Sequence, residues 1–282
     1  MPDLLHDPFV QSSVLPLLLS VVAVGVLHRL APGRWLAVAG IGATFLAVFA
    51  LVVGVPALPP PSSMGKLFWS VAGGFVLGLG ADAVGVKGRA GSALAAVWLA
   101  ASLVWIALPA LDTPVAFATL LVLLLVGACV VFGGTGDSQR GGAVAPAAVL
   151  LALALAVGGT ALIGSSASIA QMALALAAAT GGFLLWNWPI ERHGWGVSGR
   201  VASGIAVLLA GVLALFTQTE AAVLLLALPA LLAERLGRRL PLPDSGFGRA
   251  AGGAVVTVLS VLPALIAIGV AYLLGGAEAS PY

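Results

Sequence analysis

The chain has 282 residues, of which 61% are hydrophobic and 8% are charged, and its formal net charge is +2. A soluble domain carries about 25% charged residues, so this chain cannot cover a water-facing surface with polar side chains. We therefore expect the lipid bilayer to be its solvent and its first partner. The basic residues are spread one or two per segment, which argues against a nucleic-acid surface. The richness in Ala, Gly and Arg is typical of proteins from GC-rich bacteria.

The apolar runs are continuous, as in Leu120–Val126, rather than alternating. This pattern favours spanning helices over the strands of a membrane barrel. Each span needs about 20 residues, so ten spans leave room only for short loops. We predict an all-α, polytopic bundle of ten transmembrane helices that forms a single domain over residues 1–282. In chain order the predicted helices cover 10–28, 35–55, 66–84, 91–109, 114–133, 143–163, 167–188, 200–216, 218–235 and 249–275. The eighth and ninth are short, and a re-entrant pair is the alternative.

Basic residues lie almost entirely at one set of helix ends. With ten alternating spans, eleven of the twelve basic residues fall on one side and Lys66 alone falls on the other. The positive-inside rule makes the first side cytoplasmic. Both termini are then predicted to be periplasmic, in the inner membrane of a bacterium. The eleven are Arg29, Arg34, Lys87, Arg89, Arg140, Arg192, Arg200, Arg235, Arg238, Arg239 and Arg249.

Few side chains capable of catalysis or of ligand coordination lie within the predicted helices. All three His lie near helix ends, which argues against haem ligation inside the bundle, and the single Cys129 allows no internal disulfide or Cys-based metal motif. Asp82 is the candidate for a carboxylate within the membrane, and it lies near the inner end of its predicted helix rather than at the centre. We therefore expect no enzyme activity, no cofactor, no metal and no buried ion-coupling carboxylate.

Two groups of helix residues are candidates for a substrate pathway or for helix packing. Gly74, Gly78 and Asp82 are four residues apart and share one face of the third helix. The two glycines form a small-xxx-small pattern that permits close helix approach. Pro229 and Pro263 lie inside the ninth and tenth helices, where proline gives a kink, a hinge or a polar path lining.

Polar residues near the ends of the seventh helix complete the candidates. Gln171 lies near its outer end, where it could line a vestibule. At the inner end, the segment Gly181–Arg200 contains Asn187, the only Asn of the chain, with Glu191 and Arg192 nearby. The main interpretation of this segment is a cytoplasmic turnaround anchored by Trp residues. A cytoplasmic gate formed by Glu191 and Arg192 is the alternative.

Two functions remain open. The first is a small transporter or exporter of a neutral or amphipathic solute. The second is a non-catalytic membrane subunit, assembly factor or scaffold that packs against other membrane subunits or against its own copies. A polar central cavity would favour the transporter, whereas a solid interior with exposed small-residue faces would favour the scaffold.

Overall fold

The computed structural model describes residues 7–30, 36–133, 142–239 and 245–275. Arg34 and Arg140, two of the basic residues predicted to be cytoplasmic, lie outside the described residues. Within those ranges every regular element is a helix. The elements are η2 (Val10–Val14), α1 (Leu15–Leu30), η3 (Leu36–Val38), α2 (Ala39–Val52), α3 (Ser63–Ala83), α4 (Gly88–Ala107), η4 (Leu108–Ala110), α5 (Pro114–Gly133), α6 (Val144–Ile163), α7 (Ala167–Trp186), α8 (Val197–Phe216), η5 (Ala221–Leu232), α9 (Ala233–Gly237) and α10 (Gly246–Gly275).

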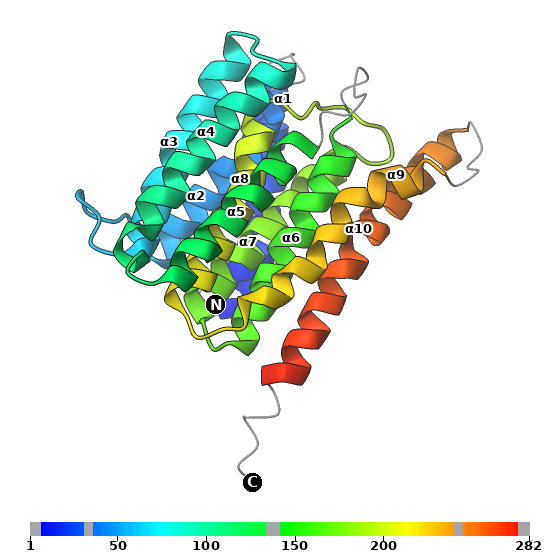
Figure 1. Cartoon of the computed structure of the whole chain (residues 1–282). Coiled ribbons are helices and arrows are strands. Elements are labelled where there is room, and N and C mark those ends of the chain that lie inside the picture. Colours follow the sequence, from blue (N-terminus) through cyan, green and yellow to red (C-terminus); the bar gives the residue numbers. More distant parts are fainter. Residues whose placement is uncertain (1–6, 31–35, 134–141, 240–244, 276–282) are drawn as a thin grey trace.

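Eight helical segments in the described residues are long and apolar enough to cross a membrane. Leu36–Val52 is a further apolar helix that is shorter. These segments agree with the predicted class of a multi-pass helical membrane protein. Figure 1 shows that the helices form one bundle, in which α1 begins and α10 ends at the same end, while the α3–α4 turn and α9 lie at the other end.

Helix α8 runs through the centre of the bundle. It packs against α2, α3, α4, α5, α6, α7 and η5, and its side chains from Val201 to Leu209 are all buried. A helix in this position must be apolar on nearly every side, which explains why Ser203 is its one polar side chain after Arg200. The interior of the bundle is therefore filled by α8.

The eighth predicted helix was too short. The sequence interpretation began it at Arg200, but α8 begins at Val197 and has 20 residues. Its start is buried, and Asp82 of α3 accepts hydrogen bonds from its first two backbone N–H groups. An acceptor supplied by another helix is invisible to a local search for a cap, so the start was misplaced. The re-entrant interpretation of the eighth segment was based on its short predicted length, and the observed 20 residues of α8 remove that reason.

The ninth predicted helix has an unexpected geometry. Its first part, η5, is a 3₁₀ helix of 12 residues, and only the last five residues form the α-helix α9. Runs of 3₁₀ helix longer than about four residues are uncommon. Pro229 lies within η5 and has no N–H to donate, and its ring crowds the carbonyl four residues earlier in α geometry. The proline thus favours the departure from α geometry in the turn that precedes it.

Glycines on α3 set its distance from its neighbours, as the small-xxx-small pattern predicts. A Cβ atom on Gly78 would lie 2.9 Å from the Cα atom of Ser198 on α8, and one on Gly74 would overlap the indole of Trp98 on α4. Gly73, on the same helix, is exposed and has no neighbouring heavy atom within 4 Å of such a Cβ. The face defined by Gly74 and Gly78 is therefore a packing face.

Gly78→Leu is expected to lower the melting temperature strongly or to prevent assembly, because the backbone of α8 would have to move away from α3. Gly78→Ala is expected to cost about 1–3 kcal/mol, the usual cost of overpacking. Gly73→Leu is the matched control and should leave the melting temperature unchanged. Thermal unfolding in detergent measures all three. Equal melting temperatures for Gly78→Leu and Gly73→Leu would show that α3 and α8 do not need this contact.

Candidate functional site

Asp82 lies at the junction of α3 and α8 rather than in a solute path. The side chain is 8% exposed. Its two carboxylate oxygens accept hydrogen bonds from the backbone N–H groups of Val197 and Ser198, at 2.6 and 2.9 Å. The first N–H groups of a helix have no partner inside the helix, and a carboxylate there also interacts favourably with the helix dipole. Asp82 therefore acts as the cap of α8.

Glycine at 196 is required by this cap. A Cβ atom there would overlap the carboxylate of Asp82, so only glycine lets the carboxylate reach the start of α8. Arg200 lies one turn into the helix and donates from Nη1 to the carbonyls of Trp195 and Gly196. The side chains of Asp82 and Arg200 thus fix the backbone at the start of α8 through hydrogen bonds.

Asn187 organises the other end of the same connection. It is 2% exposed. Its Oδ1 accepts hydrogen bonds from the backbone N–H groups of Arg192 and His193, at 3.0 and 2.9 Å, and its Nδ2 donates to the carbonyl of Phe183. The amide at the membrane surface thus has its partners within its own turn, which is a structural role.

Glu191 and Arg192, the gate candidates, have exposed side chains at the surface of this connection. Glu191 accepts a hydrogen bond from the backbone N–H of Val144, at 3.0 Å, and so serves the start of α6. Arg192 contacts Asn187 through its backbone N–H. Hydrogen bonds of this kind to backbone N–H groups agree with the turnaround interpretation.

Part of the turnaround is buried. His193 is 4% exposed, and its ring lies 5.1 Å from that of His28, 6.2 Å from that of Phe183 and 6.4 Å from that of Trp186, between ring centroids. Trp186 donates from Nε1 to the carbonyl of Val21. The connection is folded onto α1 and α7 because its aromatic rings have apolar surface to bury.

The remaining sequence candidates are dispersed. Gln171 is partly buried near the start of α7, Pro229 lies in η5 and Pro263 lies in α10. The structure does not bring these three together with Asp82 and Asn187 into one site. The sequence candidates are thus divided between the packing of α3 on α8, the connection before α8 and separate positions on α7, η5 and α10.

A larger hollow lies elsewhere, in the half of the bundle that contains the start of α5. It has a volume of about 540 Å³ and is lined by α5, α6, α8 and η5. It exists because α5 packs on α4 and α8, whereas η5 packs on α6 and α10. Most lining side chains are Ala, Val and Leu, and the polar ones are Thr119, Thr219 and Glu220 at one end. We call this hollow the outer cavity.

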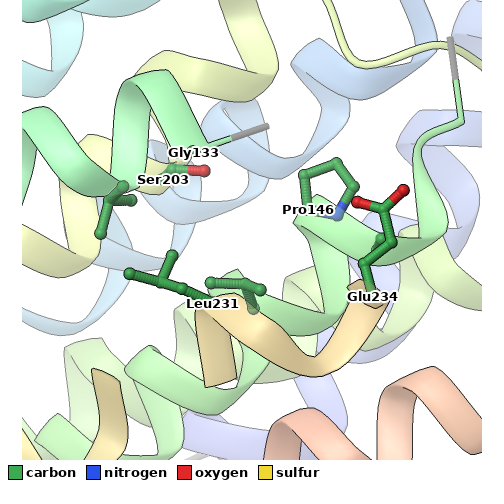
Figure 2. A pocket seen from close by; sticks show the side chains of 8 residues that line it. Gly133, Pro146, Ser203, Leu231 and Glu234 are labelled. Atoms are coloured by element: carbon green, nitrogen blue, oxygen red, sulfur yellow. The ribbon is translucent and has the colours of Figure 1, made fainter. Parts of the chain in front are cut away.

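A second, smaller hollow lies further along the same helices. It has a volume of about 40 Å³. Figure 2 shows Gly133 at the end of α5, Pro146 of α6, Ser203 of α8, and Leu231 and Glu234 of η5 and α9 around it. We call it the inner hollow. The term seam is used for the region between α5, α6, α8 and η5–α9 in which both hollows lie.

The two hollows come close to one another along the seam. On α8, Ala206 lines the outer cavity and Ser203 lines the inner hollow. On η5, Leu228 lines the outer cavity and Leu231 lines the inner hollow, and Pro229 lies between these two residues in the chain. About one helical turn therefore separates the hollows, and a carboxylate lies at each far end, Glu220 and Glu234.

Sequence reasoning missed the outer cavity, although one signal for it was present. Ala206, Ala210 and Ala214 are four residues apart and form a small-residue stripe on one face of α8. Such a stripe is equally typical of close helix packing. Only the position of η5 decides that the stripe faces a hollow.

The seam contains no set of side chains typical of catalysis or of metal binding. Among the described residues no group of three or more His, Cys, Asp or Glu side chains could hold a metal ion. The outer cavity is within the size range of ligand sites, about 300–1,000 Å³, and is apolar with a few polar groups, as such sites are. It is therefore the candidate ligand site among the described residues.

Comparison with known proteins does not assign a family. No protein-family model matches the chain, and no curated protein matches its sequence.

Asp82→Ala is expected to destabilise the protein by about 2 kcal/mol or more, because two buried N–H groups lose their acceptor and each costs about 1–3 kcal/mol. Asp82→Asn should fall between the wild type and Asp82→Ala, since an amide keeps one acceptor oxygen. Glu191→Gln is the control: its cap is exposed and glutamine can still accept from Val144. Melting temperatures in detergent test the order. A melting temperature for Asp82→Ala equal to that of the control would contradict the capping role.

Proposed function

We propose that the protein is a multi-pass protein of a bacterial inner membrane that moves an amphipathic solute along the seam. The observation that carries the proposal is the succession of two hollows lined by the same helices, one nearer the start of α5 and the other nearer its end. An apolar path with a carboxylate at each end suits a solute that has an apolar body and a polar head. The path lies at the side of the bundle because α8 fills its centre.

The threading that goes with this proposal has ten crossings and both termini in the periplasm. At about 2.0 Å per residue in η5 and about 1.5 Å in α9, the ninth segment spans about 31 Å, enough for a hydrocarbon core of about 30 Å. The second segment, Leu36–Val52, spans about 27 Å on the same basis, a mismatch that a bilayer accommodates. The segregation of basic residues supports the orientation.

Reporter fusions are expected to show this threading. Alkaline phosphatase fused after Tyr282 should be active and a fluorescent protein there should be dark, because the positive-inside rule places the last helix end outside. The same reporters fused after Gly237 should give the opposite pair of results. A fluorescent fusion after Tyr282 would overturn the orientation and the number of crossings together.

The 3₁₀ geometry of η5 supplies a candidate moving part. A stretch of 3₁₀ helix within a longer helix often marks a hinge. A change of part of η5 to α geometry would shorten it and shift the residues around Pro229, which separate the outer cavity from the inner hollow. In this proposal the seam opens by movement of η5, while α8 stays fixed by its contacts.

Transport is tested with the purified protein in lipid vesicles. The probe is lysophosphatidylethanolamine with a dithionite-sensitive fluorophore on its acyl chain, placed in both leaflets. Dithionite bleaches only the outer leaflet unless the probe crosses. We expect bleaching to proceed beyond the outer-leaflet fraction with the wild type, and to stop there with Ala210→Trp, whose indole would fill the outer cavity.

The matched control places the same indole on a lipid-facing position of α5. Leu121 is 51% exposed and does not line the outer cavity, so Leu121→Trp should move the probe like the wild type. The melting temperature of Ala210→Trp should not fall, because the indole occupies empty space. Equal probe movement with both variants would rule out the seam as the path.

The filled centre favours a second candidate function, a non-catalytic membrane subunit. In that case the small side chains of the outer cavity would receive a helix of another subunit, as small-residue faces do. The vesicle assay would then show no probe movement. A membrane protein would copurify in fixed ratio with the wild type and with Leu121→Trp, but not with Ala210→Trp.

A further inference from the structure

We propose that the outer cavity binds a single-chain amphiphile with a primary ammonium head, its chain along α5 and α8 and its head at Glu220. This inference rests on the proposed function and names its substrate class. Three properties of the cavity carry it: its depth, the size of its lining side chains, and the charge at its end.

The depth of the cavity matches one leaflet of a bilayer. Its lining on α5 begins at Val115 and ends at Val126, which is about 16 Å at about 1.5 Å per residue. The hydrocarbon core is about 30 Å thick, so the cavity covers about half of it. A chain that enters from one leaflet would thus be contained without crossing the midplane.

The lining of the cavity suits one flexible chain. The floor is formed by Ala206, Ala210 and Ala214 of α8, with Ala156 of α6 beside them. Methyl side chains on a helix leave a smooth channel between the larger Val and Leu side chains of α5 and η5. A narrow apolar channel of this kind accommodates an alkyl chain more readily than a wide aromatic ring system.

The end of the cavity offers acceptors and a negative charge. Glu220 precedes the first residue of η5, and its side chain is exposed at the cavity. The hydroxyl of Thr119 donates to the carbonyl of Val115 at 2.9 Å and keeps its lone pairs for a donor. The hydroxyl of Thr219 lies 3.0 Å from that of Thr217.

Positive charge is lacking among the side chains that line the cavity. Lys66, the basic residue that the charge pattern assigns to this end, donates from Nζ to the carbonyl of Trp105 at 2.9 Å, across α3 and α4. Asp112 is a further exposed carboxylate in the turn before α5. A head whose only charge is a carboxylate or a phosphate would therefore meet like charge, which is unfavourable, whereas a terminal ammonium group has three donors for the acceptors present.

The test compares three ligands that share one chain: hexadecylamine, hexadecanol and hexadecanoate. Each is titrated at pH 7 into the full-length protein in non-ionic detergent, and bound ligand is counted by native mass spectrometry. We expect hexadecylamine to bind more tightly than hexadecanol by up to about fivefold, the upper limit for a solvent-exposed charge pair. Hexadecanoate should bind more weakly than both.

Three variants test which residues bind the ammonium head and the alkyl chain. Glu220→Gln should remove the preference for the amine and leave hexadecanol binding unchanged. Asp112→Asn, an exposed carboxylate that does not line the cavity, should keep the preference. Ala210→Trp should weaken binding of all three ligands.

The outcomes separate this inference from the proposed function. Hexadecanoate that binds as tightly as hexadecylamine, or a preference that survives Glu220→Gln, overturns the ammonium site. Unchanged binding in Ala210→Trp overturns the location of the chain. A protein that binds the amine selectively but moves no probe in vesicles keeps this inference and loses the transport proposal.

Discussion

The buried start of α8 is the constraint on which the rest of the structure depends. The first N–H groups of a helix need acceptors, and water does not supply them inside a packed bundle. Asp82 supplies two acceptor oxygens from α3. Gly78 lets α3 come close enough, and Gly196 leaves room for the carboxylate. With its start satisfied, α8 can pass through the centre and carry the contacts of the surrounding helices.

A filled centre determines where any ligand can be held. The interior of the bundle is occupied by α8, so the larger hollow lies at the side, between α5 and η5. In the transport proposal, this lateral position suits molecules that already partition into the bilayer.

Several polar residues that the sequence offered as site candidates form hydrogen bonds with backbone N–H groups. Asn187, Glu191 and Asp82 each accept hydrogen bonds from N–H groups at a turn or at the start of a helix. In a membrane protein an unsatisfied backbone group is costly, so scarce polar side chains collect where helices begin. A polar residue near a helix end in such a chain is thus a candidate cap before it is a candidate for a functional site.

The sequence by itself determined the membrane class, the order of the helices and the fact that Gly74 and Gly78 share one helix face. These follow from hydropathy and from the helical repeat, which are local properties. It also located Asp82 near the C-terminal end of its helix. Only the tertiary structure decided that Asp82 caps α8, that His193 is buried and that the Ala stripe of α8 faces a hollow. Each of these depends on which helices meet, as when α5 packs on α8 while η5 packs on α10. No local pattern of residues encodes that choice, because the same alanines could face another helix as readily as an empty space.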